Sequence, residues 1–340
     1  MRALQSLAAG GPDTLVIREV DAPVPGAGQV AVTVHACGVN FPDGLVIEDR
    51  YQLRPARPFS PGSELAGVVS AVGEGVTSLA VGERVSASLP FGAMAETVVV
   101  SEDRCIVIPD AMPFDEAAAL QVTYGTVYYA LLGRGGLRPG ETLLVLGAGG
   151  GIGLAAVELG KALGARVVAA ASSPDKLEAA TAMGADVGLV YPREMSDVAD
   201  ARAFSEAIRT ACDGKGPDVV IDPVGGAYAE PAFRSIGWEG RYLVVGFAAG
   251  IPSIPLNLTL LKGAQIIGVF WGAYIARDPG AGARDMRALL DLYVAGRIRP
   301  QVWERYPLEE GGRAIARLAS RQARGKVVVE VICSGNRMMN

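Results

Sequence analysis

A glycine-rich run from Gly147 to Gly153 is the first stretch whose residue types could do chemistry. It reads G-A-G-G-G-I-G, so Ala148 takes the first place of a G-x-G-x-x-G pattern, and Gly150 and Gly153 take the others. The run follows the apolar segment 142–146 and precedes a helical pattern. In that context small residues allow a sharp turn and let helix amides reach a pyrophosphate. We predict a dinucleotide-binding loop rather than a purely structural turn, with Ala148 tolerated if its backbone needs no positive φ.

The residues after the next expected strand, 165–171, bear on which dinucleotide is bound. A site for NAD usually carries Asp or Glu at the end of this strand, to accept hydrogen bonds from the ribose. This chain has Ala171 there, followed by Ser172, Ser173 and, soon after, Lys176. Hydroxyl donors and a cation without a carboxylate suit a 2′-phosphate, so the predicted cofactor is NADPH. The alternative is that the serines only cap the following helix and Lys176 is solvated.

The elements that position these residues change in character along the chain. From about residue 126, short buried strands alternate with helical patterns, which is typical of βαβ units and a parallel sheet. Residues 1–125 instead show many short strands separated by glycine turns, which suggests a sandwich or partial barrel. We therefore predict an α/β protein in which a Rossmann doubly wound parallel sheet, residues 126–271, is inserted in a β-rich domain formed by 1–125 and 272–340.

Composition narrows the class of protein. The 340 residues suggest two domains, and 50% of them are apolar, enough for a sizeable core. The net charge is −5 with no basic stripe, which argues against a nucleic-acid partner. The four cysteines form no C-x-x-C pair, and no apolar run approaches the ~18 residues of a membrane span. With no signal-peptide pattern either, we expect a cytoplasmic protein.

Several segments together resemble the zinc-free quinone oxidoreductases, or zeta-crystallin-like enzymes, of the medium-chain dehydrogenase/reductase superfamily. The matching pieces are ACGVNFPDGL (36–45), PFSPGSELAGVVSAVGEGV (58–76), GERV (82–85), GAMAETVVV (92–100), TYGTVYYAL (123–131), GAGGGIGLAAVELGKALGARV (147–167) and RGKVVVEV (324–331). The resemblance implies that the β-rich domain is GroES-like and that the chain is an oxidoreductase.

Departures from the zinc-dependent branch of that superfamily concern the metal ligands. That branch carries a cysteine where this chain has Asn40, and a G-H-E motif where this chain reads G-S-E with Ser63. Zinc needs three or four converging Cys, His or carboxylate ligands, and the single histidine, His35, lies in an expected strand. We expect no bound metal. Without a metal or base to activate an alcohol, the expected acceptors are quinones or carbonyl-conjugated alkenes, which take up hydride readily.

The resemblance also assigns site residues. At the adenosine end of the cofactor, it places Gly150, Gly151 and Ile152 at the pyrophosphate, Ser172, Ser173 and Lys176 at the 2′-phosphate, and Tyr191 near the adenosine phosphate. At the other end, it places Asn40 and Thr126 at the nicotinamide ribose or carboxamide, and Gly246, Phe247 and Ala248 at the nicotinamide. Phe270 and Trp271 are expected to line the site, and Lys326 to close over the cofactor phosphates. Each aromatic residue could instead be core. Tyr51, on a loop, is the candidate donor to a developing oxyanion, and a merely packed tyrosine is the alternative.

Some alternatives stay open. The acceptor could be an enone, an acrylate-type acid or an enoyl thioester, and the chain could be a non-catalytic NADPH-binding protein or a reductase domain detached from a synthase. The apolar segment 264–270 is expected to end the Rossmann sheet. Because an exposed apolar edge strand invites pairing, and the family commonly pairs two such edges, we expect a homodimer.

Overall fold

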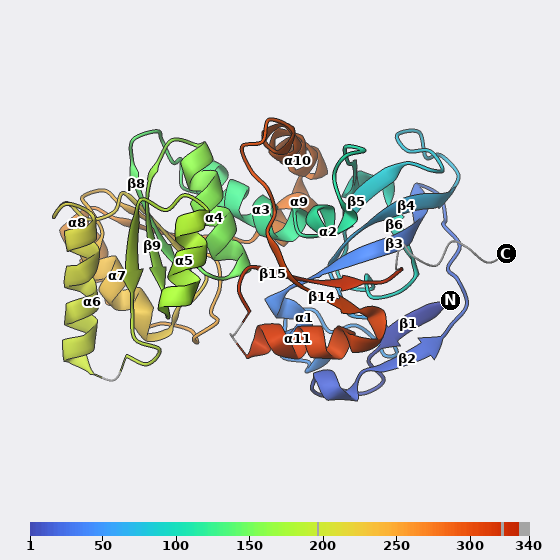
Figure 1. Ribbon diagram of the computed structural model, residues 1–340, viewed down its shortest axis with the longest axis horizontal. Helices are drawn as coiled ribbons and strands as arrows, with labels where there is room; N and C mark the ends of the chain where they lie inside the picture. The colour runs from blue at the N-terminus through green and yellow to red at the C-terminus, as the bar shows by residue number, and fades with distance from the viewer. Residues whose placement is uncertain (196, 321–322, 333–340) are drawn as a thin grey trace. The chain divides into compact units, whose positions relative to one another are not determined.

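The computed structural model describes residues 1–195, 197–320 and 323–332 (Figure 1). The chain divides into two compact units. Unit 1 comprises Met1–Val122 and Arg277–Asn340, and unit 2 comprises Thr123–Ala276. The sequence had suggested boundaries after residues 125 and 271. Unit 2 is thus continuous in sequence, whereas unit 1 is assembled from both ends of the chain.

A six-stranded parallel sheet forms the centre of unit 2, in the order β10-β9-β8-β11-β12-β13. Its strands are β8 (Thr142–Leu146), β9 (Arg166–Ala171), β10 (Val187–Val190), β11 (Val219–Asp222), β12 (Arg241–Val244) and β13 (Gln265–Gly268). The first strand in sequence, β8, lies between β9 and β11, so the direction of winding reverses beside it. This order confirms the predicted doubly wound sheet, whose ligand sites lie at the carboxyl ends of the strands near the reversal.

Helices cover both faces of this sheet. They are α3 (Gln121–Tyr128, which crosses the unit boundary) with a π-helical turn (Tyr129–Arg134), α4 (Gly151–Ala162), α5 (Pro174–Ala182), α6 (Val198–Ala211), α7 (Ala229–Ser235) after a 3-10 turn (Gly226–Tyr228), α8 (Asn257–Lys262) and α9 (Trp271–Arg277). Phe204 and Phe233, from α6 and α7, share a core with Leu144. Helix α4 packs on the other face, where a Cβ at Gly160 would lie 2.7 Å from Leu143.

Unit 1 is built on an almost entirely antiparallel sheet in the order β14-β15-β3-β4-β5-β7, with β6 also paired to β3. The strands are β3 (Gln29–Val39), β4 (Glu64–Val72), β5 (Arg84–Ser88), β6 (Thr97–Ser101), β7 (Cys105–Val107), β14 (Val302–Pro307) and β15 (Lys326–Glu330), and a separate pair is β1 (Arg2–Gln5) with β2 (Val16–Glu19). The first half of β3 pairs with β6 and the second half with β15. The pairing of β3 with β4, on its other edge, shifts register between Ala31 and Val32 and between Val34 and Ala36.

Unit 1 also contains the helices α1 (Phe41–Ile47), α2 (Phe114–Ala118), α10 (Pro279–Val294) and α11 (Gly311–Ala319), with 3-10 turns at Pro12–Thr14, Glu102–Arg104 and Leu308–Glu310. Residues from both ends of the chain share one core, in which Leu4 and Val30 belong to the same cluster as Ile315 and Val329. Among the described residues, no helix is long and apolar enough to cross a membrane.

Candidate active site

The glycine loop joins β8 to α4 and has the geometry of a phosphate-binding turn. Positive φ falls on Gly147 (+63°) and not on Ala148, so the alanine in the first motif position carries no backbone strain. The buried Ala148 donates its N–H to the carbonyl of Ala170, 2.9 Å away. A Cβ at Gly153 would lie 2.2 Å from the carbonyl oxygen of Gly147, so the helix approaches the strand as closely as only glycine allows.

The first turn of α4 leaves its amide groups directed at the loop. Gly150 is the N-cap residue with extended backbone (φ −89°, ψ 173°), and no side chain caps the helix. Gly151 and Ile152 begin the helix. An uncapped helix N-terminus presents N–H donors and the positive end of the helix dipole to an anion. This turn therefore fits the pyrophosphate of a dinucleotide.

The carboxyl end of β9 brings the predicted 2′-phosphate residues to the same loop. Ser173 is the N-cap residue of α5, but its hydroxyl makes no capping hydrogen bond. Lys176, in the first turn of α5, packs against the glycine loop, since a Cβ at Gly149 would lie 2.6 Å from the Lys176 Cβ. Ala171 is buried and carries no acid. The serines and the lysine therefore adjoin the glycine loop, and the Ser173 side chain is not used as a helix cap.

Asp222, at the carboxyl end of β11, is a buried acid that the sequence reasoning did not single out. One carboxylate oxygen accepts the N–H groups of Val224 (2.7 Å) and Gly225 (2.9 Å), and the other accepts the hydroxyl of Tyr242 (2.6 Å). Burial raises the pKa of Asp222, and these hydrogen bonds oppose the rise. Val224 in turn contacts Gly147, so Asp222 supports the glycine loop from the neighbouring strand. The signal in the sequence is an acid directly before P-V-G-G.

The predicted nicotinamide residues follow β12. The N–H of Gly246 bonds to the carbonyl of Asp222 at 3.2 Å, and that of Ala248 bonds to the carbonyl of Pro223 at 3.4 Å. Phe247, between them, is largely exposed. Residues 246–248 are thus attached to the loop that Asp222 holds, at the reversal of the sheet.

The remaining predicted aromatic residues of unit 2 lie in contrasting environments. Tyr191 is buried against Phe204 and Tyr228, with ring centroids 5.4 and 4.9 Å apart. Phe270 is 60% exposed and Trp271 only 6%, and the buried indole N–H of Trp271 has no partner among the described residues. Thr126 is half-buried on α3.

In unit 1, Asn40 is the centre of a buried polar cluster with Glu64 and Lys326. Its amide Nδ2 donates to Glu64 Oε1 (2.9 Å), and its Oδ1 accepts from Lys326 Nζ (2.6 Å). Lys326 also pairs with Glu64, whose second oxygen accepts the N–H of Val122 at 2.9 Å. Lys326 is only 5% exposed. The lysine expected over the cofactor phosphates is therefore enclosed by an amide and a carboxylate, which indicates a role in orienting Asn40.

Asp43 lies beside this cluster, and Tyr51 packs against the core of unit 1. Asp43 is the third residue of α1 and accepts the N–H of Asn40 at 2.7 Å, closing a capping box. Burial raises the pKa of Asp43 to about 7. Tyr51 is half-buried, and its pKa is raised by burial and then by the charge of Asp43. The neutral phenol is thus favoured, as a hydrogen-bond donor must be.

The positions that hold zinc ligands in the zinc-dependent branch carry an amide and a hydroxyl in contact. Asn40 Nδ2 lies 3.3 Å from Ser63 Oγ. His35 is stacked on Phe114 with ring centroids 4.3 Å apart. Within residues 1–195, 197–320 and 323–332, no three His, Cys, Asp or Glu side chains are grouped to hold a metal ion. Cys333 lies outside the described residues.

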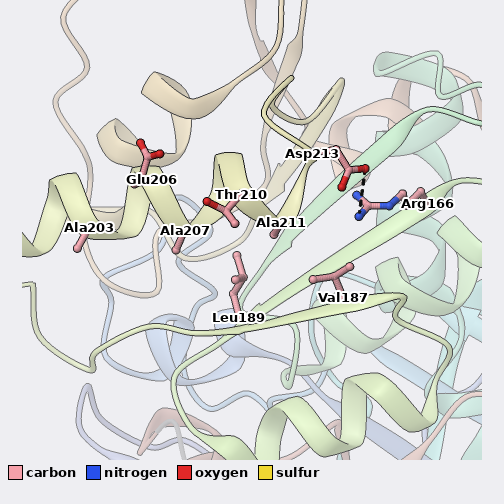
Figure 2. Close-up of a pocket in the computed structure, with 9 residues that line it drawn as sticks. All are labelled: Arg166, Val187, Leu189, Ala203, Glu206, Ala207, Thr210, Ala211 and Asp213. Carbon is pink, nitrogen blue, oxygen red and sulfur yellow. Dashed lines mark ion pairs between the residues drawn. The ribbon is translucent and has the colours of Figure 1, made fainter.

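An open groove of about 680 Å³ in unit 2 is separate from these residues. Figure 2 shows it between α6 and β10, with the Arg166–Asp213 ion pair at one end. None of the predicted site residues lines it.

Comparisons with known proteins agree across nearly the whole chain. Family models described as an alcohol dehydrogenase GroES-like domain and a zinc-binding dehydrogenase match residues 26–110 and 151–294. Quinone oxidoreductase-like protein 2 of Bos taurus is 38% identical over 319 residues, which cover 93% of this chain and 89% of the relative. The structure of Escherichia coli quinone oxidoreductase complexed with NADPH has a TM-score of 0.87 at 27% identity, covering 97% of this chain and 100% of that one. A mycobacterial structure complexed with NADPH has a TM-score of 0.89 at 29% identity, with the same coverage.

Proposed function

Because the chain belongs to the quinone oxidoreductase family of the medium-chain dehydrogenase/reductase superfamily, we propose that it reduces a quinone or a carbonyl-conjugated alkene with NADPH, without a metal. That it is an oxidoreductase using a nicotinamide cofactor follows from the family. The observation that carries the choice of NADPH is the pairing of Ala171 with Lys176. The strand end has no acid, and the lysine packs against the glycine loop.

The cofactor would be held by residues that follow β8, β9, β10, β12 and β13 of unit 2, together with Thr126 and Asn40. Gly150, Gly151 and Ile152 would bind the pyrophosphate through backbone amides, Ser172, Ser173 and Lys176 the 2′-phosphate, and Tyr191 the adenosine end. Gly246, Phe247, Ala248, Phe270 and Trp271 would line the nicotinamide, and Thr126 and Asn40 would meet its ribose or carboxamide. When bound, NADPH supplies a hydride.

The acceptor we propose follows from the groups that the protein offers. Alcohol oxidation needs a metal or a base to take the hydroxyl proton, and the ligand positions of the zinc branch carry Asn40 and Ser63. A quinone or enone needs only a donor for the oxygen that becomes negative. Tyr51 would provide that donor, and Lys326 would hold Asn40 in the required orientation.

The test is NADPH oxidation by purified protein with quinones, enones, acrylates and enoyl thioesters, each with and without prior chelation. We expect turnover with at least one acceptor, a preference for NADPH over NADH, and rates unchanged by chelation. Oxidation of alcohols with NADP⁺ and no turnover in the panel would overturn the proposal. Activity lost on chelation and restored by zinc would overturn the metal-free part alone.

We also propose a homodimer formed through the outer edge of β13. This strand ends the sheet of unit 2, and apolar side chains on it and on the preceding α8 are exposed, among them Leu260 (81%), Leu261 (66%) and Ile266 (39%). An unpaired edge next to exposed leucines favours association. A cytoplasmic location stays a prediction from the sequence.

A further inference from the structure

Residues 223–226 form a short loop after β11 that contacts two segments of the proposed cofactor site. The loop reads P-V-G-G, and both glycines have positive φ, +67° at Gly225 and +57° at Gly226. This backbone conformation is open to glycine and strained for other residues. The chain therefore turns sharply at the carboxyl end of β11, beside the reversal of the sheet.

On one side, backbone hydrogen bonds join the 223–226 loop to the segment 245–250. Four N–H groups of that segment donate to carbonyls of residues 222–224, namely those of Val245, Gly246, Ala248 and Ala249. In return, Gly226 donates its N–H to the carbonyl of Gly250 at 2.7 Å. The segment 245–250, which contains the predicted nicotinamide residues, is thus positioned by the 223–226 loop.

On the other side, the 223–226 loop packs against the glycine loop. A Cβ at Gly147 would lie 2.7 Å from Cγ2 of Val224, so the two loops are in contact. The glycine loop also has an attachment of its own, because Ala148 donates its N–H to the carbonyl of Ala170. The 223–226 loop therefore links the two ends of the proposed cofactor site, and the nicotinamide end depends on it more.

The side chain of Asp222 holds this loop from the interior of unit 2. One carboxylate oxygen accepts the N–H groups of Val224 and Gly225, and the other accepts the hydroxyl of Tyr242. Asp222 and Tyr242 are each 1% exposed, and the Tyr242 ring packs edge-on against Phe233 with centroids 5.6 Å apart. Hydrogen bonds buried in this way are shielded from water, and their removal leaves costly unpaired groups.

We propose that Asp222 is a positioning residue for hydride transfer. By holding the 223–226 loop, it fixes the segment 245–250, and with it the nicotinamide, relative to the glycine loop. This inference rests on the proposed function, because it takes residues 246–248 as the nicotinamide site. Hydride transfer needs the reacting atoms in a narrow range of distance and angle, and a misplacement of about 1 Å costs up to roughly 100-fold in rate.

Asp222→Ala removes the three hydrogen bonds, and we expect it to lower kcat by roughly 10- to 100-fold. KM for NADPH should change less, because the glycine loop keeps its bond to Ala170 and the close approach at Gly153. Asp222→Asn is the conservative variant. Its amide oxygen still accepts the two N–H groups, and its NH2 group donates to the Tyr242 oxygen, so kcat should stay near the wild-type value.

Asp218 provides the matched control at the opposite end of the same strand. It directly precedes β11, is half-buried, and accepts the N–H of Thr142 at the start of β8 at 2.7 Å. Asp218→Ala also removes a hydrogen bond made by an acid at a strand end, but away from the cofactor site. It should lower the stability of the protein and leave kcat and KM at their wild-type values.

Hydrogen–deuterium exchange of the protein without cofactor gives a readout that needs no turnover. In Asp222→Ala, the amides of Val224 and Gly225 and those of the segment 245–249 should exchange faster together, by roughly tenfold or more. In Asp218→Ala these amides should keep their wild-type protection. Should Asp222→Ala fail to fold, Tyr242→Phe removes one of the three hydrogen bonds, keeps the ring, and should show the same pattern more weakly.

A folded Asp222→Ala protein with wild-type kcat would overturn the proposal, as would faster exchange of Val224 and Gly225 with the segment 245–249 unaffected. A value of kcat in Asp222→Asn as low as in Asp222→Ala would also count against it. Those outcomes leave the proposed function intact. Wild-type protein that reduces no acceptor in the panel, while Asp222→Ala shows the coupled exchange, would instead refute the proposed function and the role in hydride transfer with it.

Discussion

Lys176 is the side chain on which the proposed choice of NADPH depends most. It packs against Gly149 in the glycine loop, and the strand end next to it carries Ala171 instead of an acid. A charge-assisted hydrogen bond to a 2′-phosphate contributes about 1.5–3 kcal/mol. NADH has no such phosphate, so the contribution belongs to NADPH alone.

Lys176→Ala should therefore raise KM for NADPH by roughly 10- to 100-fold and leave KM for NADH nearly unchanged. Steady-state kinetics with both cofactors measures the ratio. Lys161→Ala is the control, because Lys161 pairs with Asp186 on the surface of the same unit. Equal effects of Lys176→Ala on both cofactors would contradict the assignment of NADPH.

Some of these groupings of residues could be predicted from the sequence and others could not. The glycine loop and Ser172, Ser173 and Lys176 are local patterns, so their grouping followed from a strand, a turn and a helix start. The contact of Asn40 with Lys326 joins residues 286 positions apart, and no local pattern indicates it. Resemblance suggested a phosphate partner for Lys326, whereas the structure shows its ammonium buried beside an amide and an acid.

At the scale of secondary-structure elements, the backbones of β8 and α4 approach each other very closely where the glycine loop joins them. The missing Cβ of Gly153 leaves room for the carbonyl of Gly147, which would otherwise lie 2.2 Å away. The same junction is supported by Val224 from the loop that Asp222 holds. A displacement of α4 would therefore move the amide donors of its first turn away from the proposed pyrophosphate site.

Gly153→Ala should destabilise the protein by about 1–3 kcal/mol and weaken NADPH binding, because the helix must move away from the strand. Denaturant unfolding and cofactor titration measure the two effects. Gly44→Ala in α1 is the matched control, since its Cβ would meet only Ile315 at an ordinary 3.5 Å. Gly153→Ala with the stability and affinity of wild type would show that the close approach is not required.

Element types were predicted better than their details. The alternation of strands and helices correctly indicated the parallel sheet, because strands buried on both faces read as continuous apolar runs. Helix α8 was not predicted, since six residues after a proline-rich stretch give almost no periodic signal. Trp271, just beyond the apolar segment 264–270, begins α9.

For the whole molecule, the outer edge of β13 determines the expected assembly. Replacing Leu260 and Leu261 with Glu should convert a dimer to monomers, because charges on an apolar contact must be desolvated. Light scattering of wild type and variant measures this change. Val24→Glu, which alters an exposed apolar residue of unit 1, should leave the mass unchanged. A monomeric wild-type protein would contradict the proposal.

Because unit 1 is formed from both ends of the chain, its two segments are synthesised at different times, one before unit 2 and one after it. Unit 2 is continuous, so all of it has left the ribosome before β15 is made. Until then the second half of β3 lacks its β15 partner, and Glu64 lacks the ammonium of Lys326. The amino-terminal segment therefore cannot complete its sheet, or the ion pair between Glu64 and Lys326, until β15 has been synthesised. Translation arrested before Lys326 should therefore yield a folded nucleotide-binding unit tethered to an unfinished partner, a state that protease digestion of stalled chains would reveal.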